Sequence, residues 1–535
     1  MILLFKLRYF NLFVQCGNIS LIYLDKVSKM GYYLNVKSGD VVIDITLCLA
    51  YAGKETFQME KKRIYCGWGR RNITPPQPSP LQGQFHVRIP THTNDPLYAT
   101  AFAVCTEGEL PVVWCSVDIV EIVGSTLDEI TAEIQKFIPD FTRDRLIVGT
   151  IHTHTGPGLF ANAMNECWGE AFEVETPEGC MPPDEYRVKF FVPLVAAACV
   201  EAIEKLAPSG VASELGHAVL GHPRRVTYRD GSSVMYGNTN EYGFDCLEGC
   251  NDNSVEMLYT FNEKDELSGA ILNFHCPAQV LEMQEYYSAD FVGYFRMQLE
   301  ALLGYELPVL PIIGDAGNIA PRDLVRRNRG EPDMHEIPGA KELGRRLCVC
   351  FAEHVDHASQ NICHEVEFAH KFDILQLPLR TVTETEYREA KAAYDAILER
   401  VGGVEALRNS DAGTRMDSSW HAGVVNRYKR QQKSTLCDTP VHALRIGDCA
   451  FVTNPFELYI EYGLRTRARS KAIHTFTAEL TDGCMAYLPT PIAVASKSYS
   501  AMVSNCVASC EAGEILTEIS IRMINDMFDE EDAEQ

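Results

Sequence analysis

Two histidines separated by one residue, His152 and His154, stand in the segment IHTHTGPG at residues 151–158. On extended backbone, side chains two residues apart point the same way, so both imidazoles can approach one ion or one substrate. The Gly-Pro-Gly that follows ends the strand and lets a ligand come close to the backbone. A lone histidine is usually structural, but a pair in such a loop favours a functional site. The segment predicts one wall of a catalytic metal site, with zinc as the expected metal.

A catalytic zinc site needs three protein ligands or more, so distant segments must contribute. The segment NFHCP at residues 273–277 offers His275 and Cys276 at the end of an expected strand. Imidazole and thiolate are both good zinc donors. Adjacent residues on extended backbone face opposite ways, so we expect only one of the two to reach the metal.

Two further segments offer oxygen donors. In TNPFE at residues 453–457, the proline is expected to start a helix and Glu457 to lie in its first turn. The helix dipole favours an acid there with or without a metal. In DGCMAYLPT at residues 482–490, Tyr487 taken alone indicates packing, because tyrosine is an uncommon zinc ligand. Two carboxylates at strand ends, Asp118 and Asp315, are candidates to orient the metal ligands by hydrogen bonds, without binding the metal themselves.

The elements that position these residues alternate between strands and helices. A strand, helix, strand unit directly precedes the histidines, and ligand sites of open α/β sheets gather where strands end. Residue 125 is a candidate serine cap for its helix. The expected strands are 98–105, 112–117, 145–150, 257–261, 270–274, 309–313, 372–378 and 449–453. The expected helices are 125–138, 183–206, 290–303, 339–354, 384–401 and 456–470. The pattern predicts an α/β, or mixed α+β, layered fold with the metal site at strand ends.

Composition limits the partners and the compartment. The 535 residues carry a formal net charge of −25, which argues against a nucleic-acid partner because such binding depends on basic patches. Nineteen cysteines are scattered without paired CxxC motifs, as expected for buried thiols in a reducing, cytoplasmic compartment. Cys484, Cys506 and Cys510 lie close in sequence, but separate thiols are favoured over a metal or redox cluster.

The two ends of the chain differ from the middle. Residues 1–58 carry six basic and four acidic side chains, and their apolar start is neither a good signal peptide nor a membrane span. We expect them to lie outside the functional fold, with translation beginning at Met59. Residues 59–520 are then the catalytic domain, and 521–535 are an acidic, frayed tail. The oligomeric state cannot be inferred from these patterns.

In this order, the four segments resemble the catalytic domain of the neutral, non-lysosomal ceramidases and their bacterial relatives. The flanking segments GWGRRNITP, DPLYATAFAV, YSADFVGY, GDAGNIAPR and NPFELYIEYGLRTRAR follow the same family order. The resemblance implies one zinc held by His152, a residue of NFHCP, Glu457 and Tyr487. It places His154 beside the scissile amide, where it transfers a proton or stabilises an oxyanion.

The chain departs from the family pattern in two places. The family has His directly before Pro at the second ligand, whereas here Cys276 precedes Pro277 and His275 stands one residue earlier. The family also has Ser before Pro after the GD turn, where this chain has Ala320. A possible nucleophile and hydrogen-bonding group is therefore missing. No C-terminal β-sandwich is expected after residue 520, which weakens the case for a lipid substrate.

The expected function is zinc-dependent hydrolysis of an amide by activated water, which needs no serine. His154 would be the catalytic group, with Asp118 and Asp315 as supports. The substrate would be a small-molecule or lipid-like amide, with ceramide itself doubtful. One alternative is a metal hydrolase of a non-lipid amide or ester. Another is an inactive member that binds a ligand, since fold does not fix function.

Overall fold

The computed structural model describes residues 59–529, apart from the side chain of Glu166, and the backbone of a few short strands outside them. Those strands are β1 (Leu3–Leu7), β2 (Phe10–Val14), β3 (Ile22–Leu24), β4 (Gly31–Tyr33), β5 (Thr56–Phe57) and β27 (Glu531–Asp532). Residues 60–529 form one compact unit, described below. The start at Met59 stays a prediction.

The first sheet has the strand order β10-β6-β7-β8-β9. Its strands are β6 (Lys62–Asn72), β7 (Tyr98–Thr106), β8 (Val112–Val117), β9 (Leu146–Thr150) and β10 (Ala207–Pro208). β8 and β9 pair in parallel across helix α1 (Gly124–Ile134), as a strand, helix, strand unit requires. In β7, Ala101 and Ala103 face one hydrophobic cluster while Phe102 and Val104 face another. Both faces of this sheet are therefore buried.

Two further sheets contain the strands that end near the other candidate segments. The second has the order β11-β16-β17-β18, with β11 (Gly210–His217), β16 (Ser254–Phe261), β17 (Leu267–Phe274) and β18 (Val309–Ile313). The third has the order β21-β22-β23-β25, with β21 (Phe368–Pro378), β22 (Leu436–Ile446), β23 (Cys449–Thr453) and β25 (His474–Ala478). In each sheet the last pair of strands is parallel, so their carboxyl ends meet.

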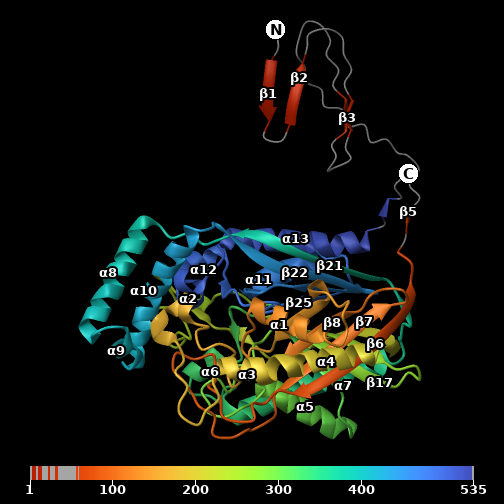
Figure 1. The fold of residues 1–535 in the computed structure, drawn as a ribbon, viewed down its shortest axis with the longest axis horizontal. Coiled ribbons are helices and arrows are strands. Elements are labelled where there is room, and N and C mark those ends of the chain that lie inside the picture. The colour runs from red at the N-terminus through yellow and green to blue at the C-terminus, as the bar shows by residue number, and fades with distance from the viewer. Residues whose placement is uncertain are drawn as a thin grey trace. The chain divides into compact units, whose positions relative to one another are not determined.

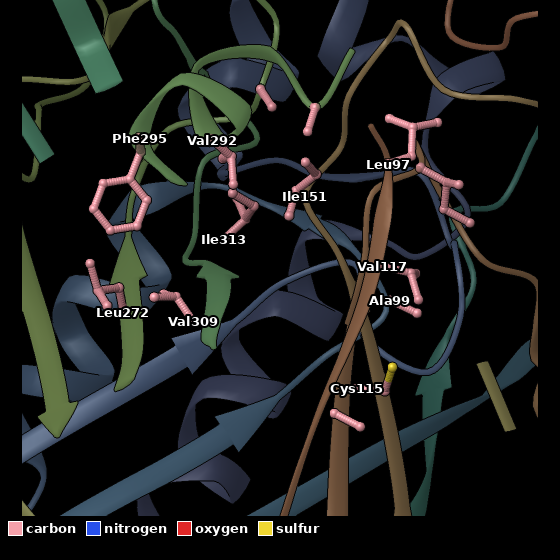
Figure 2. Close-up of a cluster of buried hydrophobic side chains, with 14 of the residues drawn as sticks. Leu97, Ala99, Cys115, Val117, Ile151, Leu272, Val292, Phe295, Val309 and Ile313 are labelled. Carbon is pink, nitrogen blue, oxygen red and sulfur yellow. The ribbon is translucent and has the colours of Figure 1, made fainter. Parts of the chain in front are cut away.

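Helices cover the sheets on both sides (Figure 1). α4 (Val192–Glu204) lies along β6, and α13 (Cys510–Phe528) lies along β21 and β22. α5 (Asp290–Leu303) and α7 (Glu336–Ala358) pack together and cover the second sheet. One cluster fills the space where the three sheets meet, with Trp114 and Phe451 in ring contact. Figure 2 shows part of another cluster, with side chains from β7, β8, β17, β18 and α5.

The remaining elements are shorter or lie at one end. α8 (Glu384–Val401), α9 (Val404–Arg408) and α10 (Ala412–Gln431) form a helical projection whose base contacts α2 (Asn165–Trp168). α3 (Pro183–Tyr186) leads into α4 through a π-helical turn. Others are β12 (His222–Pro223), β13 (Arg225–Tyr228), β14 (Ser233–Met235), β15 (Phe244–Leu247), β19 (Ile319–Ala320), β20 (Glu365–Val366), β24 (Glu457–Leu458), β26 (Tyr487–Leu488), α6 (Leu324–Asn328), α11 (Ile460–Arg469) and α12 (Pro491–Ser496).

The predicted fold class, mixed α and β layers with strands flanked by helices, is confirmed. Several boundaries differ. α1 begins at Gly124 without a side-chain cap, so the expected capping serine is not used. α13 continues to Phe528 and buries Ile524 and Met527, so the expected boundary at 520 falls inside a packed helix. No helix in residues 59–529 is long and apolar enough to cross a membrane.

The cysteines of residues 59–529 are free thiols. The three that lie close in sequence have separate partners: Cys484 bonds to Glu121, Cys506 to the Ser500 carbonyl, and Cys510 to its neighbour Glu511. They form no cluster, as the sequence favoured.

Candidate metal centre

His152 and His154 follow β9 directly, and their rings meet edge to face. His152 has a φ of 59°, so the pair meets through a turn and not through the expected extended backbone. Its Nδ1 lies 2.8 Å from the Val120 carbonyl oxygen, which can only accept, so Nδ1 carries the hydrogen and Nε2 a lone pair. That Nε2 lies 3.3 Å from His154 Nε2 and 3.8 Å from an oxygen of Glu457.

His154 is held by a loop and by a buried amide. Gln279 Nε2 lies 2.7 Å from His154 Nε2, and the Gln84 amide lies 3.4 Å from Nδ1. The Gly83 backbone also bonds to the ring, and its φ of 103° suits only glycine. A Cβ on Gly83 would lie 2.6 Å from His154 Cγ. Burial, followed by the charge of His152, holds the pKa of His154 well below its ordinary value.

Glu457 and Tyr487 lie side by side on two short parallel strands. β24 pairs with β26 in the register Glu457 to Tyr487, and neighbours in such a pair point to the same face. Their side chains bond to each other. The prediction of a helix from residue 456 was wrong at its start, because α11 begins only at Ile460. Glu457 reaches the site from a strand and not from a helical first turn.

A buried carboxylate, Glu479, explains why this segment is extended. One of its oxygens accepts the N–H of Leu458 at 2.9 Å and that of Ala316 at 3.0 Å. These two N–H groups are thereby satisfied without helical bonding. Burial raises the pKa of Glu479 well above its ordinary value. The residue ties β24 to the loop after β18.

Arg224 adds a buried cation beside this pair. Its Nη2 donates to the Gly317 carbonyl at 2.7 Å and lies 3.9 Å from Glu457, and its guanidinium lies 5.4 Å from the centre of the Tyr487 ring. Burial by itself lowers the pKa of Arg224. Tyr487, Tyr236 and Glu457 raise it by more, so the pKa lies well above its ordinary value. Arg224 could not be predicted from the sequence, since GHPRR carries no recognisable motif.

A second buried acid, Glu121, lies near Glu457 and was also missed. Cys484 Sγ donates to one of its oxygens at 2.8 Å, and Gln82 Nε2 donates to the other at 2.6 Å. Burial raises the pKa of Glu121, and the charge of Glu457 raises it further. Both oxygens of Glu121 thus have partners within the protein.

His275 and Cys276 do not join this cluster. His275 Nε2 lies 3.8 Å from Asp252, and burial followed by the charge of Arg467 lowers its pKa to about 3. Cys276 Sγ donates to the Leu220 carbonyl at 3.3 Å. The predicted second ligand, from the NFHCP segment, is therefore not brought beside His152 in this structure.

Asp118 and Asp315 have structural partners. Both oxygens of Asp118 accept bonds from Arg296, at 2.5 and 3.0 Å. Asp315 accepts a bond from Thr477 at 2.6 Å and lies 3.4 Å from Arg467. Neither carboxylate is brought to His154, because each is engaged in its own buried ion pair.

A cavity of about 180 Å³ is lined in part by Gly83 and Gln84 of the loop that holds His154, but not by the four clustered residues themselves. A chain of ring contacts runs from it towards the site, from Trp168 to Phe85, from Phe85 to Tyr499, and from Tyr499 to Tyr487. Apolar and charged residues share the lining, among them Phe85, Trp168, Phe172, Glu173, Glu175, Arg408 and Arg415.

The residues around His152 fit a metal ion in chemistry. The 3.8 Å between His152 Nε2 and Glu457 suits two donors to one ion, each at ~2.0–2.2 Å. The Nδ1 bond to a backbone carbonyl is the arrangement that orients metal-binding histidines. Among residues 59–529, no group of three His, Cys, Asp or Glu side chains converges closely enough to hold a metal. A site here therefore needs donors of other types, such as Tyr487.

The fold is that of the ceramidases. A ceramidase complexed with C2 matches with a TM-score of 0.62 at 15% identity, over 89% of this chain and 77% of that chain. The neutral ceramidase from Pseudomonas aeruginosa matches with a TM-score of 0.61 at 16% identity, over 87% and 75%. No family model matches the chain, and no curated protein matches it in sequence. The family resemblance is thus confirmed at the level of the fold.

Proposed function

We propose that this protein is a zinc-dependent hydrolase that cleaves an amide bond. The observation that carries the proposal is the approach of His152, His154, Glu457 and Tyr487 on a ceramidase fold. His152, Glu457 and Tyr487 would hold the ion. When bound, zinc supplies Lewis acidity towards a carbonyl and lowers the pKa of water.

The protein's own groups account for proton transfer and charge. His154 is neutral, and in this structure its Nε2 lone pair accepts a bond from the Gln279 amide. When that bond opens, the same lone pair can take a proton from water and return it to the leaving amine. Arg224, a buried cation, can stabilise the negative charge that develops on the carbonyl oxygen. No hydroxyl is needed from Ala320, which is fully buried in β19.

The cavity favours a second candidate within this chemistry, a non-lipid amide. A long hydrocarbon chain requires an apolar wall, whereas charged residues such as Arg415 and Glu173 share this lining. A short or polar acyl group fits a cavity of about 180 Å³ with such walls. We therefore expect short or polar N-acyl substrates to be cleaved faster than long-chain ceramide.

The test compares two histidine variants of the full chain. His152→Ala should lose zinc, measured by mass spectrometry of the metal, together with hydrolysis of an N-acyl panel of graded chain length. His154→Ala should keep zinc and lose hydrolysis. His357→Ala, on the surface, is the matched control and should change neither. Stoichiometric zinc without turnover of any amide or ester would instead support a ligand-binding protein.

A further inference from the structure

The segment that follows β17 reaches the candidate site three residues beyond Cys276. The Ala278 N–H donates to the Ile151 carbonyl at 3.2 Å, so the chain touches the histidine segment at that point. The next residue, Gln279, turns back on itself through a bond from its N–H to the Pro277 carbonyl at 2.9 Å. This places the side chain of Gln279, and not that of His275, next to His154.

Of the two polar atoms of the Gln279 side-chain amide, only the nitrogen has a partner in the described part of the protein. The residue is 4% exposed, and its Nε2 lies 2.7 Å from His154 Nε2. Its Oε1 is buried and has no hydrogen-bond partner among the residues that the structure describes. A buried polar oxygen left without a partner costs about 1–3 kcal/mol. Such an atom beside a reactive cluster indicates a partner that the protein itself does not supply.

The hydrogen bonds around the two histidines show which atoms face that partner. An amide N–H can only donate, so the Nε2 lone pair of His154 is taken up by Gln279. His152 carries its hydrogen on Nδ1, which leaves its own Nε2 lone pair free towards Glu457. His152 Nε2 and Gln279 Oε1 therefore keep free lone pairs, whereas Glu457 and the Tyr487 hydroxyl bond to each other.

We propose that Gln279 Oε1 is the fourth protein donor to the metal, in the position for which the sequence offered His275 or Cys276. This rests on the proposed function, because it assumes that the cluster binds a metal. It also explains why no three His, Cys, Asp or Glu side chains converge among residues 59–529. Two of the four donors, a phenol and an amide, belong to other residue types.

The donor set has a consequence for metal preference. One imidazole and three oxygens form a harder site than a set with two imidazoles. Hard oxygen sets suit Mn²⁺ better than sites rich in nitrogen do. The protein should therefore distinguish Zn²⁺ from Mn²⁺ less strongly than a variant that carries histidine at position 279.

The experiment measures dissociation constants for Zn²⁺ and Mn²⁺ by calorimetry on the full chain, without any substrate. Gln279→Ala should weaken Zn²⁺ binding by about 10–100-fold, the range for losing one contributing group. Gln279→His should strengthen Zn²⁺ binding and raise the Zn²⁺ to Mn²⁺ affinity ratio. His275→Gln and Cys276→Ser, matched variants in the same segment, should bind both metals as the wild type does.

Two results would overturn the inference. The first is unchanged Zn²⁺ binding in Gln279→Ala together with unchanged selectivity in Gln279→His. The second is loss of Zn²⁺ in His275→Gln or Cys276→Ser with a native circular dichroism spectrum. If instead the wild type binds no metal, the zinc dependence of the proposed function fails, and this inference with it. Folding of each variant is checked by its unfolding midpoint.

Discussion

Two buried histidines, His152 and His275, follow strands of neighbouring sheets, yet their surroundings differ. His275 shares a compartment with Asp252 and Asp315, and the guanidinium of Arg467 bonds to Asp252 and lies 3.4 Å from Asp315. His152 faces Glu457, and the Arg224 guanidinium lies 3.9 Å from that carboxylate while it bonds to the Gly317 carbonyl and to Tyr487.

The difference separates a closed ion cluster from an open donor cluster. In the His275 compartment, Arg467 bonds to Asp252 and lies 3.4 Å from Asp315, so an added cation would meet that guanidinium. Both ring nitrogens of His275 nevertheless have no hydrogen-bond partner among the described residues. In the His152 cluster, Arg224 bonds to Tyr487 and to the Gly317 carbonyl, so Glu457 has no direct bond to a cation within residues 59–529. A histidine at a strand end is thus a better candidate ligand where the carboxylate that it faces is not already bonded to a guanidinium.

Removing the internal cation should have the largest effect. Arg467→Met leaves Asp252 and Asp315 buried without a counter-charge, and breaking a buried pair typically costs about 3–5 kcal/mol. Chemical denaturation should show that loss in the free energy of unfolding. Arg465→Met, on the same helix, breaks the half-exposed pair with Glu514 and should cost about 1 kcal/mol or less. Equal losses in the two variants would mean that the compartment is not a closed cluster.

Removing the free nitrogen should affect function rather than folding. His152→Ala should reduce amide hydrolysis by at least about 100-fold. Loss of a residue that only hydrogen-bonds to a metal ligand already lowers metal affinity or activity about 10–100-fold. His275→Gln should keep hydrolysis within a few-fold of wild type. Initial rates at saturating zinc provide the comparison, and a larger loss in His275→Gln than in His152→Ala would reverse the assignment of the two regions.

A smaller effect is expected from moving His154 without removing it. Gly83→Ala should lower kcat/KM by about 10–100-fold, because the new methyl group would meet the imidazole at 2.6 Å and displace it. Gly108→Ala is the matched control, with a φ of 84° and no atom within 4 Å of the added carbon. Both variants should lose stability through backbone strain of about 1–3 kcal/mol. Only Gly83→Ala should lose activity.

The smallest effect concerns the pH dependence of stability. Burial lowers the pKa of His275 to about 3 in the folded protein, whereas the ordinary value is 6.5. As the pH falls below 6.5, His275 is therefore protonated in the unfolded chain but stays neutral in the folded protein. Its stabilising contribution is therefore present above pH 6.5 and is lost as the pH falls towards 3. At pH 5, relative to pH 7, His275→Gln should lose about 2 kcal/mol less stability than wild type.

Denaturation curves at pH 5 and pH 7 measure this difference. His357→Gln, which alters an exposed histidine, is the control and should follow the wild type at both values. If His275→Gln and wild type lose the same free energy of unfolding between pH 7 and pH 5, the His275 ring is already protonated in the folded protein at pH 5.

Much of the fold could be predicted from local patterns. The strands at 112–117 and 309–313 and the helix at 290–303 follow from short β-branched runs and helical spacing. The segment 456–458 could not be predicted, because its extended form depends on Glu479, more than twenty residues away. Helix propensity at Glu457 was overridden by that buried carboxylate and by pairing with β26.

The sequence by itself determined which segments form the candidate site, since His152, His154, Glu457 and Tyr487 come from three of the segments first singled out. Only the tertiary structure decided which side chain of the fourth segment reaches them. Alternation along a strand points the side chains of His275 and Cys276 to opposite faces, but neither reaches the candidate site. The chain first touches the histidine segment at Ala278, after the strand has ended in a turn, where the Ala278 N–H donates to the Ile151 carbonyl. That turn and the Ile151 carbonyl it meets are long-range features, so spacing within NFHCP could not single out Gln279.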